Sequence, residues 1–368
     1  MKAAVLHEPG QDLVMEDIRL DGPSRPGEVE VQIVASAVCR SDVHCWEGGF
    51  PVYPLPFIPG HEAAGIVTGV AQGTTRVREG DHVVVTWNSS CGECWHCARG
   101  ERIHCLGIRS RYGRLHDGTV RTHLAGADGA PVYRGMDAGT FCERGVFHEN
   151  ALVPLDEDVP IEIGAMLGCT VVTGTGAALN TARVRRGDRV AVIGAGAVGL
   201  CAVQGARIAG AEQIIAVDVS DDRLATAAKV GATDLVDASQ TEVSGAVAEL
   251  TGGIGVDFAF EVVGVPETME QALTLIRRGG SVVLVGSSPR YEKMSIVPGI
   301  LTLTGRNLLG CCYGSANIDR DLPRLIQYWR SGELDLRPLM SNERPLSEVN
   351  DALAELRAGE QVRTILRP

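Results

Sequence analysis

The chain has 368 residues, of which 45% are hydrophobic and only 22% charged, so it can bury sizeable cores and is not a disordered protein. At about 150 residues per domain, this length predicts two domains. The 34 basic and 46 acidic side chains give a net charge of −12. This balance argues against general affinity for nucleic acid or for an anionic membrane, because both attract positive charge.

The eleven cysteines require an explanation. Residues 1–9 contain no apolar core of signal-peptide length. The longest apolar stretch, residues 190–203, is interrupted by three glycines and is too short for a membrane span. We therefore expect a cytoplasmic protein whose cysteines are metal ligands or reactive thiols rather than partners in disulfides.

The N-terminal part of the chain is typical of strands and loops. Residues 28–33 alternate between polar and apolar, as a half-buried strand does, and residues 81–85 also have strand character. Residues 91–137 are rich in Cys, Gly, Arg and His and show little periodicity. Such a segment has no hydrophobic core of its own, so another interaction must order it.

From residue 171 onward, short apolar strands alternate with helical segments. This alternation predicts an α/β domain with a parallel, doubly wound sheet. The expected strands are residues 189–193, 214–218, 257–263 and 281–286, and the expected helices are residues 196–209 and 222–230. Beyond residue 311 the pattern changes to helix, turn, helix and a final strand at residues 362–366.

A glycine-rich motif joins the first strand of this domain to its helix. Gly194, Gly196 and Gly199 form a G-x-G-x-x-G motif, whose glycines permit a tight turn and let backbone amides approach a pyrophosphate. Asp218 ends the next strand, where a carboxylate accepts a hydrogen bond from a ribose hydroxyl and repels a 2′-phosphate. The sequence therefore predicts a dinucleotide site that favours NAD over NADP.

A second local motif, Cys91-x-x-Cys94-x-x-Cys97 followed by Cys105, supplies four thiolates within a short segment. Tetrahedral zinc needs sulfur ligands at about 2.3 Å from one centre, and two-residue spacers permit this. Four cysteines leave no place for water, so we expect a structural zinc that orders residues 91–105.

Three further candidate ligands, Cys39, His61 and Cys169, are far apart in the sequence. Their spacing does not show whether they meet. A buried cysteine often behaves as a small hydrophobic residue, and a lone histidine is often a satisfied core or surface group. The residues alone therefore leave a structural and a functional interpretation open for each.

The whole chain resembles a zinc-dependent alcohol dehydrogenase of the medium-chain dehydrogenase/reductase family. The motifs that carry this resemblance follow one another as in that family, at residues 39–44, 60–65, 91–105, 168–174, 194–199 and 363–366. The resemblance implies a GroES-like, β-rich catalytic domain at residues 1–170, a Rossmann domain at 171–311 and a return to the catalytic domain at 312–368. It also implies an enzyme that oxidises an alcohol to an aldehyde or ketone by hydride transfer to NAD.

The same resemblance implies a second, catalytic zinc. Cys39, His61 and Cys169 would bind it and leave a fourth position open, which matches the chemistry of a Lewis-acid zinc. Asp42 would orient His61, and Glu62 would be a transient or neighbouring partner of the metal. Each chain would then hold two zinc ions.

Proton transfer and cofactor binding are assigned in the same way. Ser41 would take the hydroxyl proton, which would reach the surface through His44, although a solvated surface histidine is the alternative for His44. The residues expected to contact the cofactor are Arg40, Arg363, Thr173 and Arg223. Arg223 could equally be a solvated helix residue.

Trp87 and Phe141 fall where this family places aromatic pocket walls, which implies a substrate that is apolar near its reacting carbon, such as a primary, allylic or benzylic alcohol. Ordinary core packing is the alternative for both. Three arginines beside the cysteine motif either bind an anionic handle or are simply exposed: Arg109, Arg111 and Arg114. The remaining cysteines fit no ligand pattern, and we expect them to be buried and inert: Cys45, Cys142, Cys201, Cys311 and Cys312.

Other functions remain open at this point. One is a formaldehyde dehydrogenase acting on a thiol adduct of glutathione or mycothiol, and another is a reductase of activated C=C or C=N bonds. Outside enzymes, the chain could be a structural or redox-responsive NAD-binding protein, but such a protein would not need an open zinc site. Residues 106–139 resemble those of dimeric family members in length, so we expect a homodimer with residues 300–309 near the contact.

Overall fold

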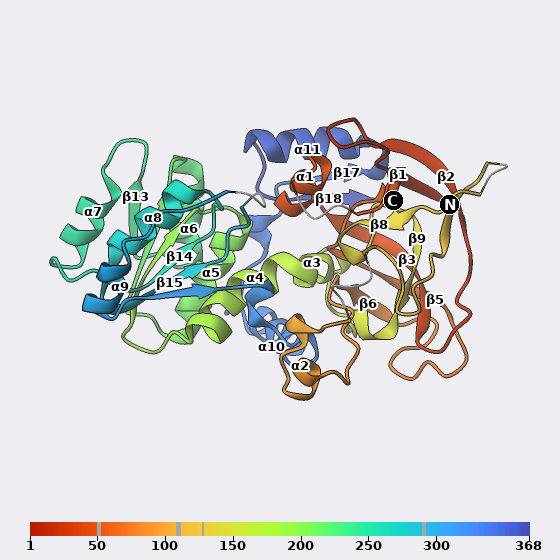
Figure 1. The fold of residues 1–368 in the computed structure, drawn as a ribbon, viewed down its shortest axis with the longest axis horizontal. Coiled ribbons are helices and arrows are strands. Elements are labelled where there is room, and N and C mark those ends of the chain that lie inside the picture. Colours follow the sequence, from red (N-terminus) through yellow and green to blue (C-terminus); the bar gives the residue numbers. More distant parts are fainter. Residues whose placement is uncertain (50–52, 108–111, 127–128, 289–291) are drawn as a thin grey trace. The chain divides into compact units, whose positions relative to one another are not determined.

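The computed structural model describes residues 1–49, 53–107, 112–126, 129–288 and 292–368 (Figure 1). The chain forms two compact units. Unit 1 comprises Met1–Cys169, Asn317–Ile326 and Leu339–Pro368, and unit 2 comprises Thr170–Ala316 and Gln327–Pro338. The chain thus leaves unit 1 after Cys169 and returns to it towards the C-terminus.

Unit 1 is built on a seven-stranded sheet in the order β10-β6-β5-β3-β18-β17, with β9 also paired to β3. All of its pairs are antiparallel except β17 with β18. The strands are β3 (Glu28–Ala37), β5 (Ala63–Val70), β6 (His82–Val85), β9 (Arg144–His148), β10 (Leu152–Pro154), β17 (Asn342–Pro345) and β18 (Thr364–Arg367). The strand expected at residues 28–33 is confirmed as part of β3, and the one expected at residues 81–85 is confirmed as β6, which begins one residue later.

Two smaller sheets complete the β-rich part of unit 1. One has the order β1-β2-β7 and the other pairs β4 with β8. Their strands are β1 (Lys2–Val5), β2 (Val14–Leu20), β4 (Phe57–Ile58), β7 (Thr122–Leu124) and β8 (Tyr133–Arg134). Apolar side chains without exposed surface, among them Leu6, Phe141 and Leu152, form the core of the unit.

Three connections in unit 1 position the residues discussed below. β3 is followed by Val38 and Cys39, and Cys39 is the residue before helix α1 (Arg40–Trp46). The last strand, β18, pairs with β3 so that Ile365 lies opposite Ala37. Strand pairing therefore brings the C-terminal segment to the end of β3.

Unit 2 contains a six-stranded, fully parallel sheet in the order β13-β12-β11-β14-β15-β16. The strands are β11 (Arg189–Ile193), β12 (Gln213–Asp218), β13 (Asp234–Asp237), β14 (Val256–Glu261), β15 (Ile276–Leu284) and β16 (Asn307–Gly310). The order runs outward in both directions from β11, as in a doubly wound dinucleotide-binding fold. The predicted fold class is confirmed.

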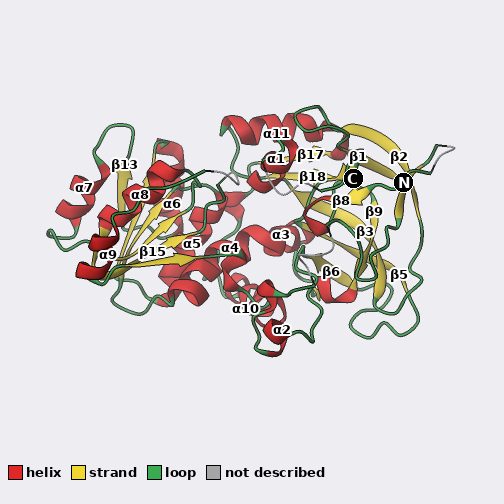
Figure 2. Ribbon diagram, viewed as in Figure 1, coloured by secondary structure: helices red, strands yellow, loops and turns green. Residues whose placement is uncertain are grey.

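The helices of unit 2 accompany this sheet (Figure 2). They are α5 (Ala197–Ala209), α6 (Asp221–Val230), α7 (Val243–Leu250), α8 (Pro266–Leu275) and α9 (Pro298–Thr304). Helices α5 and α6 contact each other, and α7 contacts α8. The C-terminal helices α10 (Ile318–Arg330) and α11 (Val349–Ala358) match the expected helix, turn, helix pattern.

A long helical segment, Ile161–Ala182, was not predicted from the sequence. It combines α3 (Ile161–Met166) and α4 (Val172–Gly176) with π-helical turns at Leu167–Val171 and Ala177–Ala182. Among the described residues, this one helix is long and apolar enough to cross a membrane, but 78% of its most apolar window is buried inside the molecule. Its apolar composition is therefore explained by packing in the protein core.

Several strand ends differ from the prediction. The final strand, expected at residues 362–366, is Thr364–Arg367, and the strand expected at residues 281–286 ends at Leu284. The strand expected at residues 257–263 ends at Glu261, because the amide of Val263 donates to the Glu261 side chain instead of continuing the sheet. The strand expected at residues 281–286 begins earlier, at Ile276, beyond an irregularity in its register with β14. Local hydrophobicity does not reveal either event.

Candidate functional site

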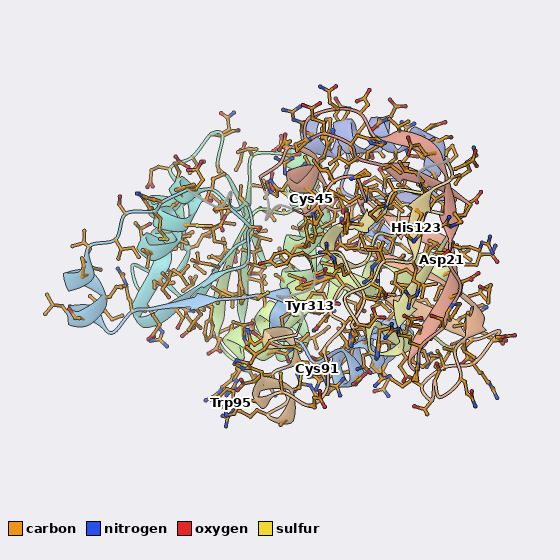
Figure 3. All side chains as sticks on the ribbon, turned by 45° about the vertical axis from the view of Figure 1, so that its right-hand side comes forward. Asp21, Cys45, Cys91, Trp95, His123 and Tyr313 are labelled. Carbon is orange, nitrogen blue, oxygen red and sulfur yellow. The ribbon has the colours of Figure 1, made fainter. Side chains whose placement is uncertain are left out.

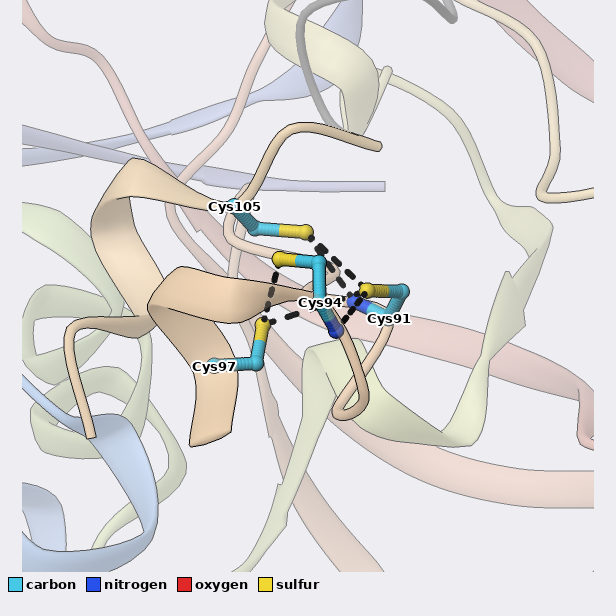
Figure 4. A group of neighbouring side chains, drawn as sticks. All are labelled: Cys91, Cys94, Cys97 and Cys105. Carbon is cyan, nitrogen blue, oxygen red and sulfur yellow. Dashed lines mark hydrogen bonds between the residues drawn. The ribbon is translucent and has the colours of Figure 1, made fainter. Parts of the chain in front are cut away.

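Four cysteine sulfurs of unit 1 come together in the segment around helix α2 (Trp95–Ala98), as Figure 4 shows. The sulfur of Cys91 lies 3.9 Å from that of Cys97 and 3.5 Å from that of Cys105, and the sulfurs of Cys94 and Cys97 are 3.6 Å apart. Sulfurs placed tetrahedrally around zinc at 2.3 Å are about 3.8 Å apart. The donor set and its spacing therefore fit a closed structural zinc site.

Backbone amides around this cysteine cluster favour thiolates. The amide of Cys91 donates to the sulfur of Cys105 at 3.2 Å, and the amide of Cys94 donates to that of Cys91 at 3.4 Å. Hydrogen bonds from backbone amides lower the pKa of Cys94 to about 6. Deprotonated thiols are the form that binds zinc.

Side-chain contacts attach the four-cysteine segment to the rest of unit 1. Arg102 lies 2.5 Å from a carboxylate oxygen of Asp319 in α10, and Arg76 pairs with the other oxygen. Trp95 is 64% exposed, with Arg99 over its ring. It lies at the edge of the molecule near Cys91 (Figure 3). The hydrophobic cluster of this segment consists of the four cysteines, which agrees with ordering by metal.

The three dispersed candidate ligands also converge. One ligand atom each from Cys39, His61, Glu62 and Cys169 lies within 4.8 Å of the others. Cys39 directly precedes α1, His61 and Glu62 directly precede β5, and Cys169 lies in the π-helical turn Leu167–Val171. Pairing of β3 with β5 is what brings the first two segments together.

Asp42 holds the ring of His61. Oδ1 of Asp42 lies 2.9 Å from Nδ1 of His61 and accepts the amide of Gly60 at 3.2 Å. Oδ2 accepts the amide of Cys39 at 2.9 Å. One carboxylate therefore fixes the positions of two of the converging residues.

The electrostatics of this cluster favour a metal ligand set. A hydrogen bond from Cys169, together with the charges of Arg363 and His61, holds the pKa of Cys39 well below its ordinary value despite burial. Burial lowers the pKa of His61, but attraction to Asp42 and Cys39 outweighs it and raises that pKa.

One buried nitrogen of the cluster is available as a zinc ligand. Nε2 of His61 is buried and has no hydrogen-bond partner among the described residues. Buried polar atoms are rarely left in this state, and a zinc ion would satisfy this nitrogen. Two thiols and an imidazole fit a catalytic zinc that keeps one position open.

The glycine-rich motif lies in unit 2 where the sequence predicted it. Gly194 has a positive φ of 99°, which favours glycine, and a Cβ on Gly199 would lie 1.8 Å from the Gly194 carbonyl oxygen. Gly196 precedes α5. At the end of β12, Oδ2 of Asp218 accepts the amide of Ala195 at 2.7 Å, which ties the predicted ribose-binding carboxylate to the motif.

Comparison with known proteins identifies the family. Residues 25–157 match the alcohol dehydrogenase GroES-like domain, and residues 197–329 match the zinc-binding dehydrogenase family. The chain belongs to the zinc-dependent alcohol dehydrogenase family.

Whole-chain relatives support this assignment. An NDMA-dependent alcohol dehydrogenase of Amycolatopsis methanolica is 37% identical over 99% of this chain and 98% of its own. The S-(hydroxymethyl)glutathione dehydrogenase of Saccharomyces cerevisiae is 35% identical over 99% of this chain and 95% of its own. Benzyl alcohol dehydrogenase from Acinetobacter calcoaceticus has a TM-score of 0.93 at 30% identity, covering 100% of this chain and 98% of that structure. The expected enzyme class, an alcohol-oxidising oxidoreductase that uses zinc and NAD, is confirmed.

In this alcohol dehydrogenase, the expected proton relay lies on α1. Ser41 and His44 are three residues apart and so lie on one face of the helix. Burial and the positive charge of Arg40 lower the pKa of His44. The Arg40 side chain donates to the carbonyl of Arg357 at 3.3 Å.

The expected cofactor residues lie in different environments. Arg363 has only 2% of its surface exposed, in unit 1, and Thr173 is half-buried in α4 of unit 2. Nη1 of Arg223 lies 3.9 Å from Oδ1 of Asp218, so it belongs to the surroundings of the predicted ribose-binding carboxylate.

The two aromatic residues expected in the substrate pocket also differ. Phe141 has no exposed surface and packs in the core of unit 1, where a Cβ on Gly60 would lie 2.5 Å from its ring. Trp87 is half-buried after β6, and a place in the substrate pocket stays a prediction for both residues. Of the basic group, Arg114 stacks over Tyr133, whereas Arg109 and Arg111 lie outside the described residues.

One expectation about the unassigned cysteines is wrong. Four of them are buried, namely Cys45, Cys142, Cys201 and Cys311, but Cys312 is exposed. Cys312 has an extended backbone, so its side chain and that of its buried neighbour point in opposite directions. Burial raises the pKa of Cys142 to about 12, which agrees with an inert thiol.

Sequence reasoning missed one buried acid of unit 2. Oε1 of Glu261 accepts hydrogen bonds from Val263, Gly264 and Thr268, each at 2.8 Å. Oε2 is buried without a hydrogen-bond partner among the described residues, and burial raises the pKa of the carboxyl group. Its position at the end of an apolar strand, beside a glycine turn, was the available signal.

Proposed function

We propose that this chain oxidises a small alcohol, apolar near its reacting carbon, at a zinc ion held by Cys39, His61 and Cys169. The observation that carries the proposal is the convergence of these donors from three separate segments into one cluster. When bound, zinc supplies a Lewis acid for the alcohol hydroxyl, and NAD supplies the hydride acceptor. The four-cysteine segment would hold a second, structural zinc.

The residues of α1 would handle the proton. Ser41 is two residues from the proposed ligand Cys39 and would accept the hydroxyl proton, which would pass to His44. Because the pKa of His44 is lowered, its ring is neutral at neutral pH and can accept that proton. Asp42 would keep His61 in the orientation in which Nδ1 donates to the carboxylate and Nε2 remains available.

NAD would bind at the carboxyl edge of the unit 2 sheet. The amide groups at the start of α5 would receive the pyrophosphate, and Arg40 would add a positive charge. Asp218 would accept a ribose hydroxyl, with Arg223 beside it. Thr173 would contact the nicotinamide, and the substrate pocket would include Trp87.

We further propose a cytoplasmic homodimer that joins the two sheets of unit 2 edge to edge. β16 is an edge strand, and no residue of the neighbouring α9, which is described in full, is buried. Val297, Ile300 and Leu303 are 62%, 45% and 83% exposed. An exposed apolar cluster beside an open strand edge favours association. The eleven free cysteines agree with a reducing compartment.

A second candidate is oxidation of the thiol adduct of formaldehyde. It is favoured by the 35% identity to an S-(hydroxymethyl)glutathione dehydrogenase over nearly the whole chain. The two functions differ in substrate and share the metal sites.

One set of assays tests both candidates. NAD reduction is measured with aliphatic and benzylic alcohols, and with formaldehyde in the presence and absence of glutathione or mycothiol. Turnover of simple alcohols supports the main proposal, whereas strict dependence on a thiol supports the second. Zinc content is measured on the same samples, with two ions per chain expected. Cys169→Ser should lose one zinc and all turnover while remaining folded, and undiminished activity would contradict the ligand assignment.

A further inference from the structure

Arg363 is buried in an unusual place for a cofactor-binding arginine. Only 2% of its surface is exposed, although a buried positive charge is costly unless it is paired. It directly precedes β18, whose pairing with β3 carries it to the end of β3, where Cys39 lies. The register of these two strands therefore places a fixed charge beside the proposed catalytic metal centre.

The contacts of Arg363 are with that centre. Its Nη1 donates to the carbonyl of Val38 at 2.6 Å and lies 3.7 Å from Oε1 of Glu62. The guanidinium is also attracted by the charges of Cys39 and Cys169. Burial lowers the pKa of Arg363, but the charges of Glu62 and Cys39 outweigh it and hold the pKa above its ordinary value.

The buried charges of the proposed metal centre include that of Arg363. A divalent ion and two thiolates sum to zero, and the imidazole adds no charge. The buried carboxylate of Glu62 is then in excess, whereas Asp42 is met by His61 and two backbone amides. The positive charge of Arg363 offsets Glu62, and the one negative charge that remains, on Asp42, is stabilised by its hydrogen bonds.

We propose that Arg363 is a positioning residue of the metal centre, whose buried charge balances Glu62 and retains Cys39 and Cys169 as zinc ligands. This inference rests on the proposed function, because it requires those two cysteines to bind zinc. It differs from the pyrophosphate contact expected from the sequence, since it acts on the metal rather than on the cofactor.

The test compares zinc retention with NAD affinity in the full-length protein. Zinc content is measured by mass spectrometry, zinc release is followed with a chromogenic chelator, and the NAD dissociation constant is obtained by fluorescence. Arg363→Gln should weaken retention of one zinc by about 10- to 100-fold, as loss of groups surrounding metal ligands does, and leave the second zinc in place. Adding Glu62→Gln to that variant removes the carboxylate that Arg363 balances in the unaltered protein and should recover part of the loss, which a purely structural role would not do.

Arg40→Gln is the matched control, because Arg40 is an exposed arginine on the same unit. It should raise the NAD dissociation constant and leave both zinc ions as tightly held as in the unaltered protein. If Arg363→Gln retains both zinc ions normally and only NAD binding weakens, the inference is wrong and the pyrophosphate role stands.

Failure of the ligand assignment and failure to fold can both be distinguished from failure of the Arg363 inference. If Cys169→Ser retains two zinc ions, the ligand assignment itself fails, and with it the proposed function. If Arg363→Gln does not fold, as judged by circular dichroism, the Glu62→Gln/Arg363→Gln double variant decides. That variant contains neither buried charge, and it should fold with two zinc ions. A folded double variant that holds its catalytic zinc no better than the Cys169→Ser variant overturns the inference.

Discussion

Nδ1 of His61 lies 2.9 Å from Oδ1 of Asp42, and neither side chain has any exposed surface. The same carboxylate accepts the backbone amide of Cys39. Asp42, which is not itself a proposed metal ligand, therefore sets the geometry of two residues that are. Its removal should weaken zinc binding.

We expect Asp42→Ala to weaken binding of the catalytic zinc by about 10- to 100-fold, because the imidazole loses the partner that orients it. The zinc of the four-cysteine segment should be unaffected and serves as an internal reference. Zinc release to a chelator, followed on the folded variant, measures the effect. Release at the unaltered rate would show that Asp42 does not support the metal.

Asp218→Gly should reduce the preference for NAD over NADP. A hydrogen bond to a charged group contributes about 1.5–3 kcal/mol, so the KM for NAD should rise by about one to two orders of magnitude. The KM for NADP should fall, since repulsion of the 2′-phosphate disappears. Asp222→Asn, at an exposed acid nearby, is the control and should change neither constant appreciably. An unchanged ratio of the two KM values would exclude Asp218 as the discriminating residue.

Glu261 should make stability fall as pH rises. Because burial raises the pKa of its carboxyl group in the folded state, the folded chain binds the proton more tightly than the unfolded chain does. The stabilisation of the folded state by the protonated Glu261 carboxyl is fully present below its ordinary pKa of 4.5. It is lost as the pH rises through the raised pKa of the folded state. Glu261→Gln keeps an oxygen for the three donors and removes the ionisable group.

Urea unfolding at pH 5 and pH 8 measures the effect. We expect the free energy of unfolding to decrease less between these two pH values in Glu261→Gln than in the unaltered chain. Equal changes in both proteins would mean that Glu261 ionises in the folded state as readily as in the unfolded one.

Leu303→Asp should dissociate the proposed homodimer. The substitution places a charge on the most exposed apolar residue of α9, which a dimer contact would have to bury. Sedimentation velocity should give a monomer for this variant and a dimer for the unaltered protein. Ile254→Asp is the control, because Ile254 is 62% exposed on a different loop of unit 2, and it should remain dimeric. A dimeric Leu303→Asp would place the contact elsewhere.

The features predicted most fully from the sequence are those encoded locally. The four cysteines lie within one short segment, and Gly194, Gly196 and Gly199 form one turn, so spacing alone indicates their chemistry. The meeting of Cys39, His61 and Cys169 depends on pairing of β3 with β5 and on a π-helical turn, neither of which leaves a periodic signal. Only the resemblance to a family connected them.

Long-range register explains what was missed at the site. The place of Arg363 follows from the pairing of Ile365 with Ala37, which hydrophobic alternation does not specify. The helical segment Ile161–Ala182 was missed because its glycines and threonines have low helix propensity, and burial on most sides outweighs that preference. Cys312 was misplaced because composition does not show which of two adjacent thiols faces outward.

The π-helical turn at Leu167–Val171 holds one residue more than a regular α turn. Deleting one residue ahead of Cys169 would restore a regular helix, and the flanking helical segments would keep their directions. Gly174, whose Cβ would lie 2.3 Å from the carbonyl oxygen of Val198, would therefore still face α5. Inside the turn, however, Cys169 would move by one helical position, about 100°, away from its present direction. The extra residue thus sets the direction of the Cys169 side chain without disturbing the helix around it.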